Sequence, residues 1–122
     1  MFTVEYETLP HYALCRPIGE LDSSTAQQLR EALGSQPAPR RLVIDLSQVP
    51  FVDSAGLGAL IGGIRRTREA GGDVAISAPH REVLAVLRTT GFDRILPVTA
   101  SVEEAVAALD ELDVEAHRPH HA

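Results

Sequence analysis

The segment from Arg41 to Gly72 constrains the fold most, because a short apolar run is followed there by the pattern of an amphipathic helix. The run 42–46 reads Leu-Val-Ile-Asp-Leu, which is typical of a strand in a sheet covered by helices on both faces. Four apolar residues then recur at the spacing of one helix face and are expected to be buried, namely Leu57, Leu60, Ile61 and Ile64. Gly71 is expected to end this helix, together with the glycine that follows. A buried strand that leads into a helix predicts an α/β fold.

Asp53 and Ser54 stand at the start of the predicted helix. Either side chain can accept hydrogen bonds from the first free N–H groups, and the positive end of the helix dipole favours negative charge there. A hydroxyl at this point is well placed to carry an anion. Gly56 and Gly58 follow, although a glycine inside a helix costs about 1 kcal/mol relative to alanine. They indicate either a close approach of another backbone or a surface that must stay bare.

The N-terminal third of the chain predicts a β-hairpin and a helix. Residues 2–7 alternate apolar and polar, as in a half-exposed strand, and residues 11–18 are its expected partner. Pro17 has no N–H to donate to a ladder, so the second strand should end, bulge or lie at an edge near this residue. Ser24 is followed three residues later by a glutamine, the spacing of a capping box, which predicts a helix over residues 24–33.

The C-terminal half continues the alternation of strand and helix. Residues 73–78 are expected to form another buried strand. Pro79 is expected at the first position of a helix that Gly91 ends. A short last strand is expected within residues 92–96, bounded by Pro97.

A final helix is expected after Ser101, because Ser101 and Glu104 have capping-box spacing and an apolar stripe continues to Leu112. We therefore predict a single α/β domain over residues 1–113 and a disordered tail over residues 114–122. Its mixed sheet of about five strands and its set of about four helices should follow the order β-β-α-β-α-β-α-β-α, with right-handed crossovers between parallel strands.

The composition excludes several classes of function. A chain of 122 residues suits one domain with a single core. The formal net charge of −6 and the 4% of aromatic residues argue against nucleic-acid binding, which needs basic patches or stacking platforms. The single cysteine, Cys15, excludes an internal disulfide, and no apolar run suits a membrane span or a signal peptide. We expect a cytoplasmic protein without a membrane or a nucleic acid as its direct partner.

Several motifs resemble those of the anti-sigma factor antagonists, a family of the STAS domain class. They are Gly19-Glu20-Leu21-Asp22, Leu42-Val43-Ile44-Asp45-Leu46-Ser47, Phe51-Val52-Asp53-Ser54-Ala55-Gly56-Leu57-Gly58 and Gly71-Gly72. The most specific feature is the Asp-Ser pair that opens a glycine-containing helix, found together with the earlier Gly-Glu-Leu-Asp. The resemblance covers residues 2–113.

This resemblance implies a small α/β domain that regulates a partner and is not itself an enzyme. Its Ser54 would be phosphorylated by an anti-sigma factor that is also a serine kinase. The unphosphorylated form would bind that kinase and free a sigma factor, and a serine phosphatase would act in the same system. The implied partner-binding surface comprises Asp22, Asp53, Ser54, Ala55, Gly56, Leu57 and Gly58, with the two aspartates on the surface that holds the kinase and its nucleotide-bound magnesium.

The same residues allow other interpretations. Ser54 could serve only as a helix cap, and Asp22 and Asp53 could be caps or turn residues without chemistry. A hydrolase would need a base beside Ser54 and, in a nucleophile elbow, a glycine in place of Val52, so we do not expect an enzyme. The domain could also be a STAS scaffold or ligand-sensing module in a larger signalling assembly, without a kinase switch.

No cofactor or metal site is predicted. The phosphate-loop pattern is absent, and the histidines lack metal-ligand spacing: His11, His80, His117, His120 and His121. Arg65, Arg66 and Arg68 are expected to form a solvated helix face or to pair with a partner's carboxylates. Cys15 is expected to be a buried apolar residue and not a redox centre.

Overall fold

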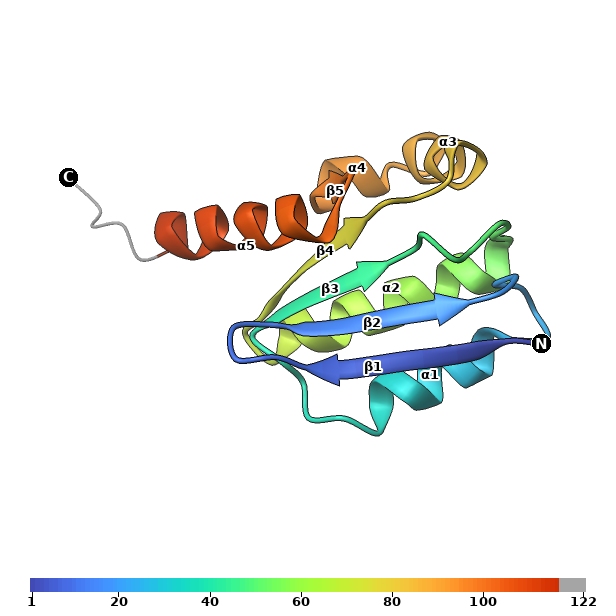
Figure 1. Cartoon of the computed structure of the whole chain (residues 1–122), viewed down its shortest axis with the longest axis horizontal. Coiled ribbons are helices and arrows are strands. Elements are labelled where there is room, and N and C mark those ends of the chain that lie inside the picture. The colour runs from blue at the N-terminus through green and yellow to red at the C-terminus, as the bar shows by residue number, and fades with distance from the viewer. Residues whose placement is uncertain (117–122) are drawn as a thin grey trace.

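The computed structural model describes residues 1–116, which form a five-stranded sheet and five helices (Figure 1). The elements in chain order are β1 (Thr3–Thr8), β2 (Ala13–Ile18), α1 (Ala26–Gly34), β3 (Arg41–Asp45), α2 (Ser54–Glu69), β4 (Asp73–Ser77), α3 (Arg81–Thr89), α4 (Phe92–Ile95), β5 (Val98–Thr99) and α5 (Val102–Ala116). The predicted α/β fold with a mixed sheet is confirmed.

The strands lie in the sheet in the same order as in the chain, β1-β2-β3-β4-β5. The β1–β2 pair is antiparallel, and each later strand is parallel to its predecessor. Pro17 lies opposite Val4 of β1, while β2 pairs with β3 only from Ala13 to Cys15. The proline therefore lies beyond the β3 ladder, where no N–H is needed on that side, as the sequence predicts.

Helices cover the two faces of the sheet. One face is packed under α1 and α2, and α5 covers β3 and β4 on the other face (Figure 1). The alternation along β3 shows this directly, since Leu42 and Ile44 belong to the larger apolar cluster and Val43 to the smaller one. The smaller cluster consists of Leu14, Val43, Ala75, Ala105 and Leu109.

The buried face of α2 differs from the prediction. Leu60 and Ile64 are buried as expected, but Leu57 is only half-buried and Ile61 is 39% exposed. The remaining buried positions are mostly small: Gly56, Ala59, Gly63 and Thr67. The helix packs closely against its neighbours through these residues, which rotates its buried stripe away from Leu57 and Ile61.

Two predicted helix starts are also wrong. Helix α1 begins at Ala26, because Ser24 donates both its N–H and its hydroxyl to Oδ1 of Asp22 and forms a turn there. Helix α3 begins at Arg81 with His80 as its N-cap residue, so Pro79 precedes the helix.

The C-terminal elements shift by a few residues. Residues 92–95 form the short helix α4, and the last strand follows Pro97 and does not precede it. The Ser101 cap is confirmed, since its hydroxyl accepts a 3.1 Å hydrogen bond from the N–H of Glu104. Helix α5 extends to Ala116, beyond the predicted domain end, whereas residues 117–122 and their histidines lie outside the described residues. Within residues 1–116, no helix has the length and apolar character needed to cross a membrane.

Candidate functional site

Two loops meet at the carboxyl ends of β2 and β3. Leu21 forms a parallel bridge with Val52, and its N–H donates to the carbonyl of Phe51 at 2.9 Å. In turn, the N–H of Asp53 donates to the carbonyl of Leu21 at 3.2 Å. These bonds hold Asp22 and Asp53 on adjoining segments, at the sheet edge where α/β domains place their sites.

Asp53, and not Ser54, caps helix α2. Oδ1 of Asp53 accepts a 2.9 Å hydrogen bond from the N–H of Gly56, which satisfies one of the free donors of the first turn. Ser54 is the first helical residue and is exposed, and its hydroxyl forms no hydrogen bond within residues 1–116. The interpretation of Ser54 as the helix cap is therefore wrong, and capping leaves its hydroxyl unused.

Asp22 adds a second carboxylate beside this helix start. Hydrogen bonds from the hydroxyl and N–H of Ser24 hold the pKa of Asp22 below its ordinary value. The adjacent Thr25 hydroxyl donates to the carbonyl of Glu20 at 2.8 Å and closes the turn. Asp22 is thus a turn residue, as one interpretation predicts, and it stays negatively charged at neutral pH.

The two glycines of the first turns have different surroundings. Gly56 is buried against Leu21, so a bare surface is not its role and the alternative of a close backbone approach is confirmed. Gly58 is half-exposed, and a Cβ atom built there would meet the Arg30 guanidinium only at an ordinary 3.6 Å. Arg30 reaches across from α1 to the side of α2.

Phe51 is an additional surface residue that the sequence analysis did not assign to the site. Its side chain is 49% exposed, three residues before Ser54, while its neighbour Val52 is buried. Ala55 and Leu57 are half-buried on the same helix start. The signal for Phe51 that the sequence offered was a large aromatic residue in a predicted loop, just before the Asp-Ser motif.

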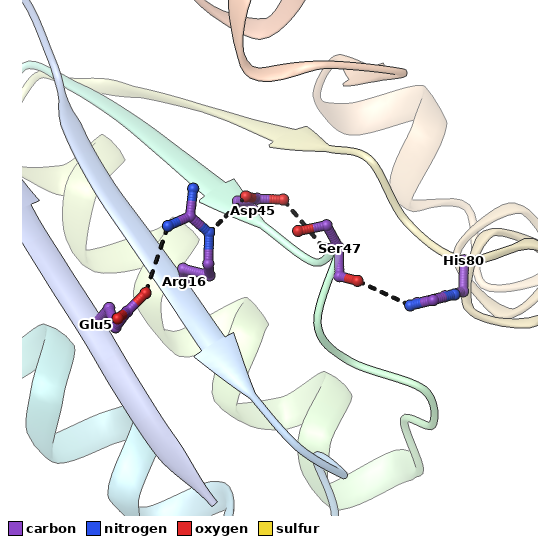
Figure 2. Close-up of polar contacts among 5 residues, drawn as sticks. All are labelled: Glu5, Arg16, Asp45, Ser47 and His80. Atoms are coloured by element: carbon purple, nitrogen blue, oxygen red, sulfur yellow. Dashed lines mark hydrogen bonds and ion pairs between the residues drawn. The ribbon is translucent and has the colours of Figure 1, made fainter.

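A chain of polar contacts supports the loop between β3 and α2 (Figure 2). Arg16 donates from Nε to Oδ2 of Asp45 at 2.8 Å, and its Nη1 lies 3.4 Å from Oε1 of Glu5. Oδ1 of Asp45 accepts from the N–H of Ser47 at 3.0 Å, and His80 Nε2 lies 2.8 Å from the Ser47 carbonyl oxygen. The loop that leads to Ser54 is therefore tied to β2 on one side and to α3 on the other.

Asp45 is only 3% exposed, which makes its charge state important. Burial alone would raise the pKa of Asp45, but the hydrogen bonds from Arg16 and Ser47 outweigh burial and leave the pKa below its ordinary value. Asp45 thus stays ionised under the loop and holds Arg16 in place.

The comparisons with known proteins agree with this geometry. The sequence model of the STAS domain matches residues 3–105. The chain belongs to the STAS domain family. This STAS domain is 29% identical to the anti-sigma F factor antagonist of Paenibacillus polymyxa over 91% of the chain and 95% of that protein.

Solved structures show the same STAS fold. An anti-sigma factor antagonist from Mycobacterium paratuberculosis superimposes with a TM-score of 0.81, at 28% identity, over 90% of this chain and 95% of that one. The Bacillus cell fate determinant SpoIIAA in its phosphorylated form gives a TM-score of 0.66 at 24% identity, over 88% of this chain and 97% of that one, and this likeness shows the fold. The resemblance to anti-sigma factor antagonists is confirmed.

Cys15 is buried as expected, and burial raises the pKa of its thiol to about 12. Among residues 1–116, no group of three or more histidines, cysteines or acidic residues could hold a metal ion.

Proposed function

We propose that this STAS domain is an anti-sigma factor antagonist that is switched by phosphorylation of Ser54. Its unphosphorylated form binds an anti-sigma factor that is also a serine kinase, and this binding frees a sigma factor. A serine phosphatase restores the binding form. The free, exposed hydroxyl of Ser54 carries the proposal, because Asp53 already caps the helix and leaves this hydroxyl without a structural task.

The similar proteins support this proposal. The relative from Paenibacillus polymyxa is named as an anti-sigma F factor antagonist, and a protein of the same fold has been solved in a phosphorylated form. In the reaction, the Ser54 oxygen bonds to the γ-phosphorus of ATP as the bond to ADP breaks, and the hydroxyl proton passes to the kinase. This domain supplies only the hydroxyl and the surface around it.

The proposed contact surface surrounds the start of α2. Exposed parts of Phe51 and Leu57 supply apolar contact, and half-exposed Gly58 leaves room for the partner. The charges of Asp22 and Asp53 face the kinase and its nucleotide-bound magnesium. The surface also includes Ser54 and Ala55, whereas buried Gly56 acts by positioning its neighbours.

Phosphorylation is expected to break the contact by charge and bulk. A phosphate adds nearly two negative charges beside Asp53 and near Asp22. One like charge on the partner, from an acidic side chain or the nucleotide about 5 Å away, opposes a double charge by about 3 kcal/mol at an effective dielectric near 40, which corresponds to about a hundredfold in affinity. The fold should survive, because the N–H groups at a helix start accommodate an anion.

The first test is the intact mass of the protein after incubation with ATP and the purified anti-sigma factor encoded in the same genome. We expect a gain of one phosphate, which Ser54→Ala abolishes. Ser24→Ala is the matched control, because Ser24 is exposed on the adjoining loop but donates its hydroxyl to Asp22. Phosphate at another residue in the wild-type protein would refute the assignment of Ser54.

The second test compares affinity with stability. Ser54→Ala should bind the anti-sigma factor permanently, and Ser54→Asp should bind it weakly, although one carboxylate carries about half the charge of a phosphate. Thermal melts of phosphorylated and unmodified protein should nearly coincide while their affinities differ at least about tenfold. Equal affinities would refute the switch hypothesis. A much lower melting temperature of the phosphorylated protein would indicate instead that the phosphate acts by unfolding the helix start.

A hollow at the opposite end of the sheet favours the alternative of a ligand-sensing STAS module. It measures about 450 Å³, within the range of small-molecule sites, and lies between the β1–β2 turn and the segment before β3. His11, Tyr12 and Arg40 line it beside prolines. A chain that gains no phosphate but melts higher with a small metabolite would support this alternative.

A further inference from the structure

A second feature of the α2 surface is an apolar groove beyond Ser54. We call it the Ile61 groove and define it by its lining residues Ile61, Ile64, Arg65, Arg68, Glu69 and Ile95, which enclose about 420 Å³. Ile61 is 39% exposed and Ile95 is 49% exposed, and they come from different helices, α2 and α4. A single exposed apolar side chain is ordinary, but two that line one hollow indicate a surface for contact.

Contacts within the domain hold the walls of the groove in place. The guanidinium of Arg68 donates to the carbonyl of Ile95 and so ties α4 to α2. Nε of the same arginine lies 3.7 Å from Oδ1 of Asp73 at the start of β4. Because both walls are fixed by these contacts, a partner would lose little free energy in ordering the groove.

The groove lies on the same side of α2 as Ser54. Ile61 follows Ser54 by seven residues and Arg65 follows it by eleven, which correspond to about two and three turns of 3.6 residues. At 1.5 Å per residue, Ile61 is about 10 Å along the helix axis from Ser54. A partner that covers the start of α2 therefore needs to extend by only two turns to reach the groove.

The charge of the groove indicates the chemistry of its occupant. Arg65 is exposed and has no carboxylate within ion-pair distance in the part of the chain that the structure describes. Glu69 lies one turn further from Ser54, so the part of the rim nearer to Ser54 is positive although the chain carries −6 overall. A complementary segment would present an apolar side chain with a carboxylate beside it.

We propose that the Ile61 groove binds the same anti-sigma factor that contacts Ser54, by receiving one of its apolar side chains with a neighbouring carboxylate on Arg65. This inference rests on the proposed function. Because the groove is remote from the phosphate, it holds the partner equally before and after phosphorylation. Phosphorylation thus weakens the contact at Ser54 and leaves the contact at the Ile61 groove unchanged.

The test measures the affinity of the purified anti-sigma factor for Ile61→Ser, Ile95→Ser and Arg65→Glu. Each variant should bind at least about tenfold more weakly, with Arg65→Glu losing most at low salt. Leu112→Ser is the matched apolar control, because Leu112 is 37% exposed on α5. Arg88→Glu on α3 is the matched charge control, and both controls should bind within about twofold of wild type. Melts should shift only slightly, since none of the substituted side chains is buried.

A double variant tests whether the groove is independent of the switch. Ile61→Ser should weaken binding by the same factor in the wild-type and Ser54→Asp backgrounds, because remote sites contribute additively. Wild-type affinity in all groove variants, with Ser54→Asp still weak, would overturn the groove and leave the proposed function intact. Failure of the wild-type protein to bind the anti-sigma factor would overturn both. Unchanged affinity with loss of a dimer in sedimentation would assign the groove to a second copy instead.

Discussion

A Cβ atom built on Gly56 would lie 2.3 Å from the carbonyl oxygen of Leu21, far closer than an ordinary contact. Gly56 is therefore the position at which the loop carrying Asp22 rests on helix α2. A Cβ atom built on Gly62, on the same helix, would meet no atom within 4 Å beyond the adjacent helix backbone, and Gly62 is exposed. These two glycines form a matched pair for substitution.

Gly56→Ala should lower the free energy of unfolding by about 1–3 kcal/mol, because the added methyl group forces a backbone shift. Gly62→Ala should raise it by about 0.5–1 kcal/mol, since alanine is the better helix former and meets no obstacle. Denaturant melts of both variants decide the matter. An equal rise in the free energy of unfolding for both variants would show that the loop carrying Asp22 does not rest on Gly56.

Leu60→Ala should lower the free energy of unfolding by about 2–5 kcal/mol, because its side chain is fully buried under the sheet and leaves a cavity. Ile61→Ala is the adjacent control and should cost less than about 1 kcal/mol, since Ile61 is exposed. The same denaturant melts measure both. Similar losses at the two positions would contradict the observed rotation of the buried face.

Asp45 should make the domain sensitive to acid. Its pKa is depressed in the folded state, so its contribution is fully present above the ordinary aspartate pKa of about 3.9 and is lost as the pH falls through the folded value. Asp45→Asn should therefore be less stable at pH 7, by about 1–3 kcal/mol, yet lose less stability on acidification. Unfolding free energies measured from pH 7 downward test this.

Asp110→Asn is the control for this acid response, because Asp110 also pairs with an arginine, Arg41, but is 54% exposed on α5. Its stability profile should stay close to that of wild type, since exposed ion pairs contribute little. An Asp45→Asn profile parallel to wild type at every pH would refute the assigned role of Asp45.

Cys15 should resist thiol reagents in the native protein. The thiol is buried and its pKa is raised to about 12, so almost no thiolate is present or accessible at neutral pH. Labelling in native buffer should proceed at the rate of unfolding, and denaturant should make it immediate. Immediate labelling of the native protein would mean that β2 opens locally.

Arg30 should stabilise the dianionic phosphate on Ser54. Its guanidinium lies beside Gly58, one turn from Ser54, and it has no carboxylate partner in residues 1–116. Phosphorus NMR of protein with phosphoserine incorporated at position 54 would measure the second phosphate pKa, ordinarily about 6. Arg30→Gln should raise that pKa, because a positive charge that favours the dianion is lost. An identical pKa in the variant would show that Arg30 does not reach the phosphate.

The sequence was sufficient to predict the α/β class, the β-hairpin and the position of Ser54 at a helix start, because alternation and capping are local signals. It did not predict that Gly56 is buried, since the contact depends on Leu21, far away in the sequence. Helical spacing alone also placed Ile61 in the core, because the face that α2 buries depends on contacts with residues far away in the sequence. The turn at Asp22 competes with capping by Ser24, and spacing cannot rank the two.

The shared order of the strands in the sheet and in the chain has a consequence for biosynthesis. Each strand adds to the edge left by the strand made just before it, so none must enter between two that are already paired. The ribosome can therefore deliver the sheet in its final order, starting from β1. Helix α5, which covers Val43 and Ala75, is made after all five strands. Ribosome-bound chains that end before Val102 should bind an apolar dye more strongly than chains that include α5. Until α5 has left the exit tunnel, the uncovered apolar face of the sheet is exposed and can bind a chaperone.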